Sequence, residues 1–187
     1  MNTLAMPQTT TTTTTWNLDP AHSVAEFKVK HLMISNVKGR FAKVSGTLTL
    51  NESDLADSQV EASIDAPSIE TGDAQRDAHL KSVDFFDVAK FPTLSFRSTR
   101  IRFVREGELT VEADLTIRGV TRKVLFSVEG PTPPAKDPWG NERLAVSATA
   151  KINRKDFGLT WNAPLESGGI LVGNEVTLSL DVQFVKA

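Results

Sequence analysis

Apolar and polar residues alternate along most of the chain, and a period of two is typical of a half-buried β-strand. In the segment SVAEFKVKH, for example, Phe27, Val29 and His31 fall on one face and mostly charged residues on the other. The same alternation predicts strands over residues 23–31, 37–50, 60–66, 93–98, 101–104, 109–117, 124–128, 144–152 and 176–184. Gly39 and Gly46 interrupt the second strand and predict bulges or bends there.

One stretch, residues 76–96, departs from this alternation. Thr71 or Asp73 can cap a helix whose interior is AQRDAHLK, with a solvated face formed by Arg76, Asp77 and Lys81. Phenylalanines then cluster within twelve positions, at Phe85, Phe86, Phe91 and Phe96. So aromatic a segment either plugs the end of a core or forms the wall of an apolar pocket.

Eight or nine alternating segments with mostly short connections favour an antiparallel meander over βαβ units. We therefore predict an all-β fold, an eight-stranded antiparallel barrel with a short helix between the third and fourth strands; a two-sheet sandwich is the alternative. A barrel of this size is filled by side chains or holds one small ligand. Small inward residues leave space for a slender guest, or else lie under the helix or at strand crossings; they are Ala25, Ala62, Ala66, Ala113, Ala148 and Ala150.

Length and composition limit the classes of function. The 187 residues suit one domain over 16–187, and the threonine-rich residues 1–15 are predicted to be a disordered tail. The chain has no cysteine, which excludes disulfides and thiol chemistry. The N-terminus lacks the basic start and apolar stretch of a secretory signal, so we expect a cytoplasmic protein without a membrane span. A net charge of −2 gives no general attraction to nucleic acid or anionic membranes, leaving room for a local basic patch.

The candidate chemical groups give no catalytic or metal pattern. His22 and His31 are an odd number of residues apart, which places them on opposite faces of an unbroken strand. No HExxH spacing, nucleophile elbow, phosphate loop or dinucleotide fingerprint is present. The run Arg154-Lys155-Asp156 is interpreted as a surface charge cluster, with a lipid head-group contact as the alternative. We predict no catalytic residues, no metal site and no required cofactor.

Short motifs spread in order over almost the whole chain resemble those of the YceI-like family. They are Asp19-Pro-Ala-His22-Ser23, Phe27-x-Val29-x-His31, Gly39-x-Phe41, Arg76-Asp77-x-His79-Leu80, Asp84-Phe85-Phe86-Asp87, Phe91-Pro92 with Phe96, Leu115-Thr116-Ile117-x-Gly119-Val120-Thr121, and Asn153-Arg154-x-Asp156-Phe157-Gly158. The resemblance implies an extended, lipocalin-like barrel whose lumen binds a long isoprenoid lipid of the polyprenol or quinone type. Many relatives are periplasmic and carry a signal peptide, and this sequence departs from them in showing none.

The resemblance also implies residues that line the lumen, at the inward positions of these motifs. They are Phe27, Val29, His31, Phe41, Phe85, Phe86, Phe91, Phe96, Leu115 and Phe157. Strand parity and side-chain size add Leu94, Phe126 and Trp161.

Three functions follow as hypotheses. The first is non-catalytic binding, storage or transport of an isoprenoid lipid. The second is an enzyme or redox accessory acting on a bound isoprenoid quinone, with His31 or His79 at the reacting end. The third is a structural module that forms a homodimer through exposed aromatic residues.

Overall fold

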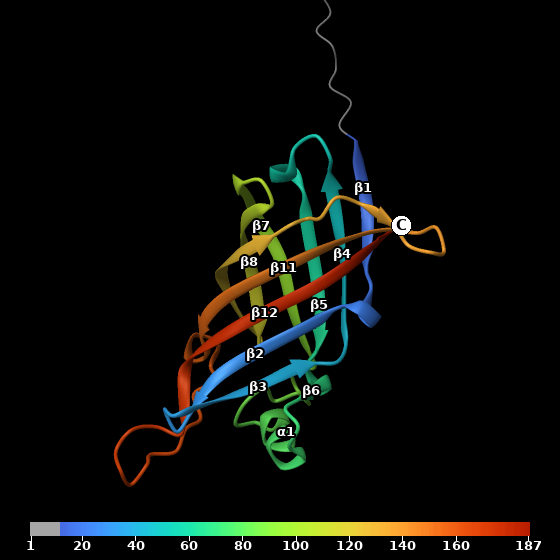
Figure 1. Ribbon diagram of the computed structural model, residues 1–187. Coiled ribbons are helices and arrows are strands. Elements are labelled where there is room, and N and C mark those ends of the chain that lie inside the picture. The colour runs from blue at the N-terminus through green and yellow to red at the C-terminus, as the bar shows by residue number, and fades with distance from the viewer. Residues whose placement is uncertain (1–11) are drawn as a thin grey trace, which may run out of the picture.

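The protein is a closed antiparallel β-barrel with a short helix at one end, as Figure 1 shows; the computed structural model describes residues 12–187. The strands are β1 (Thr13–Leu18), β2 (Val24–His31), β3 (Ser35–Phe41), β4 (Val44–Asn51), β5 (Gln59–Asp65), β6 (Ile69–Glu70), β7 (Thr93–Arg105), β8 (Glu108–Ile117), β9 (Val120–Glu129), β10 (Ala135–Lys136), β11 (Glu142–Asn153) and β12 (Val172–Lys186). The helices are α1 (Ala74–Lys81) and the short 3-10 turns η1 (Pro20–His22), η2 (Leu55–Asp57), η3 (Ala66–Ser68) and η4 (Arg154–Phe157).

Eight strands close the barrel when each long, bent strand is counted once. β1 and β2 are two halves of one such strand, and β3 and β4 are two halves of the next, because β1 pairs with β4 and β2 with β3. β12 pairs with β2 through residues 172–181 and with β1 through residues 184–186, while β11 lies along its other side. The ring continues from β4 through β5, β7, β8 and β9 to β11. The predicted meander, with its helix between the third and fourth strands, is confirmed.

The second predicted strand, residues 37–50, bends as expected, but the bend does not lie at Gly39 or Gly46. It bends at Ala42 and Lys43, which are both exposed between inward-facing Phe41 and Val44. The backbone amides at the bend are bound from elsewhere: Ala42 donates to the carbonyl of Ser68 and Lys43 to its hydroxyl. The two glycines of this region serve close packing instead. A Cβ on Gly39 would lie 2.3 Å from the ring of Phe27, and one on Gly46 would lie 2.7 Å from the Glu61 carbonyl.

Two other boundaries also differ from the prediction. The strands expected at 93–98 and 101–104 are one strand, β7, with a bulge between Ser98 and Arg100. Thr13–Thr15 were expected in a disordered tail, but they pair with residues 49–51 of β4 as the start of β1. Threonine is β-branched and suits a pleated surface, so these residues extend the sheet. Residues 1–11 of the predicted tail lie outside the described part of the chain.

The predicted helix is confirmed as α1, and Asp73 is its N-cap, accepting a hydrogen bond from the Arg76 amide at 2.8 Å. The predicted solvated face was wrong for two of its three residues. Asp77 accepts from the amide and hydroxyl of Thr71, and Arg76 donates to the Thr71 hydroxyl and carbonyl. Both side chains therefore fasten α1 to the chain that follows β6, and the helix stays at the lower end of the barrel (Figure 1).

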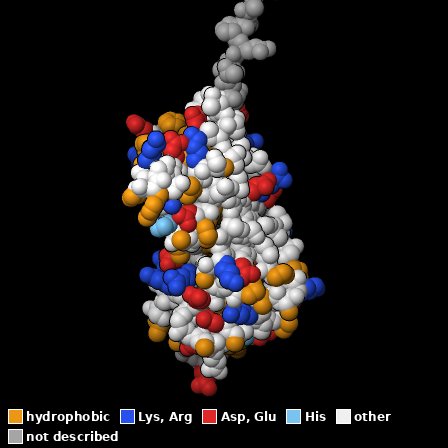
Figure 2. Space-filling model, turned by 90° about the vertical axis from the view of Figure 1, so that its right-hand side faces the viewer, with side chains coloured by type: hydrophobic (Ala, Val, Ile, Leu, Met, Phe, Trp, Pro, Cys, Tyr) orange, Lys and Arg blue, Asp and Glu red, His pale blue; other side chains and the backbone are white. Residues whose placement is uncertain are grey.

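Acidic and basic side chains are interspersed on the face of the barrel that carries β1, which Figure 2 shows. Cross-strand ion pairs such as Lys151 with Glu175, at 2.9 Å and largely exposed, are typical of the outer surface. Pairs of this kind contribute little to stability. The fold therefore depends mainly on the inward-facing apolar side chains.

Candidate functional site: the barrel lumen

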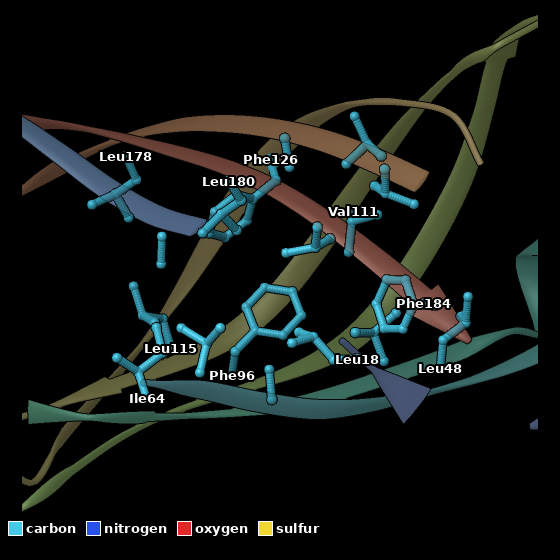
Figure 3. A pocket seen from close by; sticks show the side chains of 18 of the residues that line it. Leu18, Leu48, Ile64, Phe96, Val111, Leu115, Phe126, Leu178, Leu180 and Phe184 are labelled. Atoms are coloured by element: carbon cyan, nitrogen blue, oxygen red, sulfur yellow. The ribbon is translucent and has the colours of Figure 1, made fainter. Parts of the chain in front are cut away.

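The barrel encloses an apolar cavity of ≈ 180 Å³. All eight strands of the ring contribute to its wall, and Figure 3 shows their side chains converging on the lumen. The lining residues are Leu18, Ala25, Glu26, Phe27, Phe41, Val44, Leu48, Leu50, Leu55, Ser58, Val60, Ala62, Ile64, Leu94, Phe96, Ile101, Leu109, Val111, Leu115, Ile117, Phe126, Val128, Pro131, Val146, Ala148, Leu178, Leu180, Val182 and Phe184.

The cavity wall offers almost no polar group to a guest. Among the described lining residues only Glu26 and Ser58 are polar. Glu26 is exposed, and the Ser58 hydroxyl accepts a hydrogen bond from the Asn51 amide at 3.0 Å. Burying an unpaired polar group in such a wall is costly. The lumen is therefore suited to hydrocarbon, with any polar head group left outside.

The small residues of the barrel interior divide into two groups. Ala25, Ala62 and Ala148 line the cavity. The others belong to the packed core; they are Ala66, Ala113 and Ala150. Across the lumen, Phe96 and Phe126 meet edge to face with ring centroids 5.4 Å apart. Three of the six small residues therefore border the open volume, and the other three fill the core.

Six of the thirteen predicted lining residues lie in the cavity wall: Phe27, Phe41, Leu94, Phe96, Leu115 and Phe126. Seven do not: Val29, His31, Phe85, Phe86, Phe91, Phe157 and Trp161. Val29 and His31 share the strand parity of Phe27 and are half-buried, but they do not line the cavity. Phe157 is fully buried in the core that surrounds it.

Sequence reasoning missed many lining residues on the last strands, although their parity was correct. Leu178, Leu180, Val182 and Phe184 of β12 all alternate on the face that lines the lumen. The same holds for Val111 on β8. Strand parity alone would have found them. The prediction missed them because it drew mainly on positions within motifs.

Three phenylalanines of the cluster after α1, Phe85, Phe86 and Phe91, close the lower end of the barrel and do not line its cavity, whereas Phe96 does. Phe86 meets the cavity residue Phe41 edge to face, with centroids 5.8 Å apart. Phe85 packs on Trp161 at 5.3 Å, and His79 contacts both of these rings. Phe91 lies against Gly119, where a Cβ would come within 2.6 Å of its ring. Of the two alternatives for this stretch, the structure favours the plug for Phe85, Phe86 and Phe91 and the pocket wall for Phe96.

A buried arginine beside this plug was not predicted. Arg154 is 3% exposed and donates to the carbonyls of Gly173 (2.8 Å), Leu159 (2.6 Å), Trp161 (2.9 Å) and Val172 (3.3 Å). Burial lowers the pKa of its guanidinium. The interpretation of residues 154–156 as a surface charge cluster was therefore wrong for Arg154, which fastens the 159–173 segment to the barrel.

A second polar network holds the opposite side of the barrel together. Asp19 accepts hydrogen bonds from Arg143 at 2.6 Å and from His22 at 2.8 Å. Arg143 also donates to Asp137 at 2.8 Å, and Asp137 caps the turn that contains Trp139 and Asn141. The hydrogen bond from Arg143, followed by that from His22, lowers the pKa of Asp19 to about 2. The pKa of Asp137 is also held low, chiefly by Arg143.

The lowered pKa values of these two carboxyl groups predict that acid destabilises the fold. A carboxyl group whose pKa is lowered by folding stabilises the protein at pH values above the pKa that the group has in the unfolded chain, here 3.8. That contribution is lost as the pH falls toward the pKa of the folded state, about 2. We expect Asp19→Asn to cost about 1–2 kcal/mol at pH 7 and much less at pH 2. Urea unfolding at several pH values measures this. A cost that is the same at both pH values would contradict the assigned ionisation.

The histidines of the chain lie away from the cavity wall. None of the three histidines lines the cavity; His22 pairs with Asp19 and His79 with Asp84. Within residues 12–187 no group of three or more histidine, aspartate or glutamate side chains converges to bind a metal ion. Over the same residues, no helix has the length and apolar character needed to cross a bilayer.

Comparison with known proteins agrees with the fold and its motifs. The sequence matches the YceI-like domain over residues 16–184, which is most of the chain. The chain belongs to the YceI-like domain family. A UPF0312 protein of Staphylococcus aureus is 36% identical over 172 residues, covering 91% of this chain and 97% of its own. The family predicted from the motifs is thus confirmed.

Solved structures of YceI-like proteins have the same barrel. The YceI protein of Campylobacter jejuni aligns with a TM-score of 0.71 and 28% identity, covering 86% of this chain and 91% of its own. A domain from Saccharophagus degradans, described as a polyisoprenoid binding domain implicated in plant cell wall breakdown, aligns with a TM-score of 0.63. It is 16% identical and covers 92% of this chain and 98% of its own, a likeness that concerns the fold.

Proposed function

We propose that this YceI-like domain binds a long-chain isoprenoid lipid in its lumen, for storage or transport, without catalysing a reaction. The observation that carries the proposal is the cavity inside the barrel, walled by apolar side chains from every strand of the ring. Burying apolar surface supplies roughly 25 cal/mol per Å² before ordering costs. The structural neighbour described as a polyisoprenoid binding domain supports the choice of ligand class.

The volume of the cavity places a condition on this proposal. At ≈ 180 Å³ it is below the ~300–1,000 Å³ of ordinary small-molecule pockets and close to the ~150 Å³ of an engineered cavity that binds benzene. A long chain therefore requires side chains such as Phe96 and Leu180 to move apart along the lumen. A slender, flexible hydrocarbon needs less of this widening than a broad, rigid ring system does.

An enzyme acting on the bound lipid is the weaker reading of the same lumen. General acid or base chemistry requires a titratable group within hydrogen-bond reach of the reacting atom. Among the described lining residues Glu26 alone is titratable, and its side chain is exposed. No specific feature of the cavity favours the enzyme over the carrier.

Affinity should rise with isoprenoid chain length. We expect the dissociation constant to fall at each step from farnesol to geranylgeraniol to solanesol, because each added unit buries more hydrocarbon. Competition with a lipophilic fluorescent probe measures the series, and a quinone without its isoprenoid tail is the control. Equal affinity across the series, or tight binding of the tailless quinone, would contradict binding through the chain.

A further inference from the structure

Two loops project side by side from the lower end of the barrel, at the lower left of Figure 1. One is the β2–β3 turn, where Met33 is 57% and Ile34 is 81% exposed. The other is the 162–171 loop, in which Pro164 is exposed and Leu165 and Ile170 are half-buried. The Leu32 amide donates to the Leu171 carbonyl at 2.8 Å and joins the two loops. We call residues 32–34 and 162–171 the apolar tip.

A basic strip lies directly behind the apolar tip on the outer face of the β2–β3 hairpin. It consists of Lys28, Lys30 and Lys38, all exposed. Lys28 and Lys38 stand directly opposite each other in the register, an arrangement in which like charges destabilise a sheet. Within the described residues, none of the three forms an ion pair with a carboxylate. Glu166 is the one acidic residue of the apolar tip.

We propose that the apolar tip and the basic strip together dock this protein on an anionic lipid bilayer. Exposed apolar side chains next to lysines match a membrane interface, where the side chains enter the acyl boundary and the lysines meet anionic head groups. Anionic lipid would also relieve the repulsion between Lys28 and Lys38. The inference concerns a surface separate from the cavity and does not depend on which lipid fills the lumen.

A second copy of the chain fits this surface less well than a bilayer does. A symmetric dimer would use the same patch on both subunits. Two basic strips would then face one another, and their like charges would oppose association. The positive charge of the basic strip therefore favours an anionic partner. The two narrow loops of the apolar tip can insert into the interface of a bilayer.

Sedimentation with phosphatidylcholine vesicles, with and without phosphatidylglycerol, tests the proposal on the full chain. We expect binding to vesicles with phosphatidylglycerol, weakened by added salt because salt screens exposed charges. Ile34→Ser should reduce the partition coefficient at least about tenfold. Trp139→Ser, which changes an equally exposed side chain on another loop (81%), should leave it unchanged.

The contribution of the lysines to vesicle binding is tested by a second variant and its control. Lys30→Gln should weaken binding about fivefold, and Lys136→Gln, on the short strand β10, should change it far less. Unchanged melting temperatures and unchanged isoprenoid binding would show that each variant keeps its fold and its lumen. The proposal is overturned if phosphatidylglycerol vesicles bind no protein or if the control variants lose as much binding. It is equally overturned if Ile34→Ser only halves the solution mass, which would identify a dimer contact.

Discussion

Replacing Arg154 with methionine should lower the free energy of unfolding by about 3–5 kcal/mol, because several buried carbonyls lose their donor at once. Methionine keeps much of the length of the side chain but donates no hydrogen bond. The carbonyls of Gly173, Leu159, Trp161 and Val172 would each lose a charged donor. A buried acceptor left without a partner costs about 1–3 kcal/mol. Urea denaturation followed by tryptophan fluorescence measures the loss.

Lys155→Met is the matched control, because Lys155 is the exposed neighbour of Arg154 on the same turn. We expect that change to stay within about 0.5 kcal/mol of the wild type, as most surface substitutions do. An equal effect of the two substitutions would show that the four carbonyl contacts contribute nothing specific. The account of Arg154 as the fastener of the 159–173 segment would then be wrong.

Filling the lumen should abolish most isoprenoid binding. Ala148 lines the cavity from β11, opposite Val128 and Leu180 in the register, so a larger side chain there enters the space meant for the guest. We expect Ala148→Phe to weaken binding about a hundredfold, which corresponds to roughly 3 kcal/mol of lost apolar burial. The titration with geranylgeraniol that measures chain-length dependence also measures this.

The adjacent residue supplies the control for that substitution. Thr149 lies on the same strand and is exposed, since successive side chains of a strand point to opposite faces. Thr149→Phe therefore adds the same ring outside the barrel and should bind isoprenoids like the wild type. If both variants bind normally, the guest does not occupy the lumen. If both lose binding together with their stability, general unfolding would be the cause.

The alternation of apolar and polar residues was sufficient to predict the ring of strands and most of its inward positions. On β8, for example, Leu109, Val111 and Leu115 are buried as their parity requires. A period of two is a local property of the backbone, so it can be read from neighbouring residues alone. The motifs added the family, which the comparison with known proteins confirmed.

The features that could not be predicted all depend on contacts between distant segments. The bend after Phe41 is bound by Ser68, and the burial of Arg154 depends on a later segment folding back over it. Phe86 was expected at the lumen wall because it lies in one of the family's motifs, but its connection crosses the end of the barrel. The size and polarity of a side chain do not determine where along the barrel axis the residue lies. The cytoplasmic location, the absence of a required cofactor and the homodimer stay predictions.

The central claim is that the lumen binds an isoprenoid lipid. The most direct test is the mass of the protein when it is purified from its native cell. Native mass spectrometry of the purified protein should show a lipid adduct, and solvent extraction should release a compound with an isoprenoid chain. The Ala148→Phe variant, purified in the same way, should carry far less of it. An empty protein that takes up no isoprenoid alcohol or quinone when these are supplied would contradict the claim.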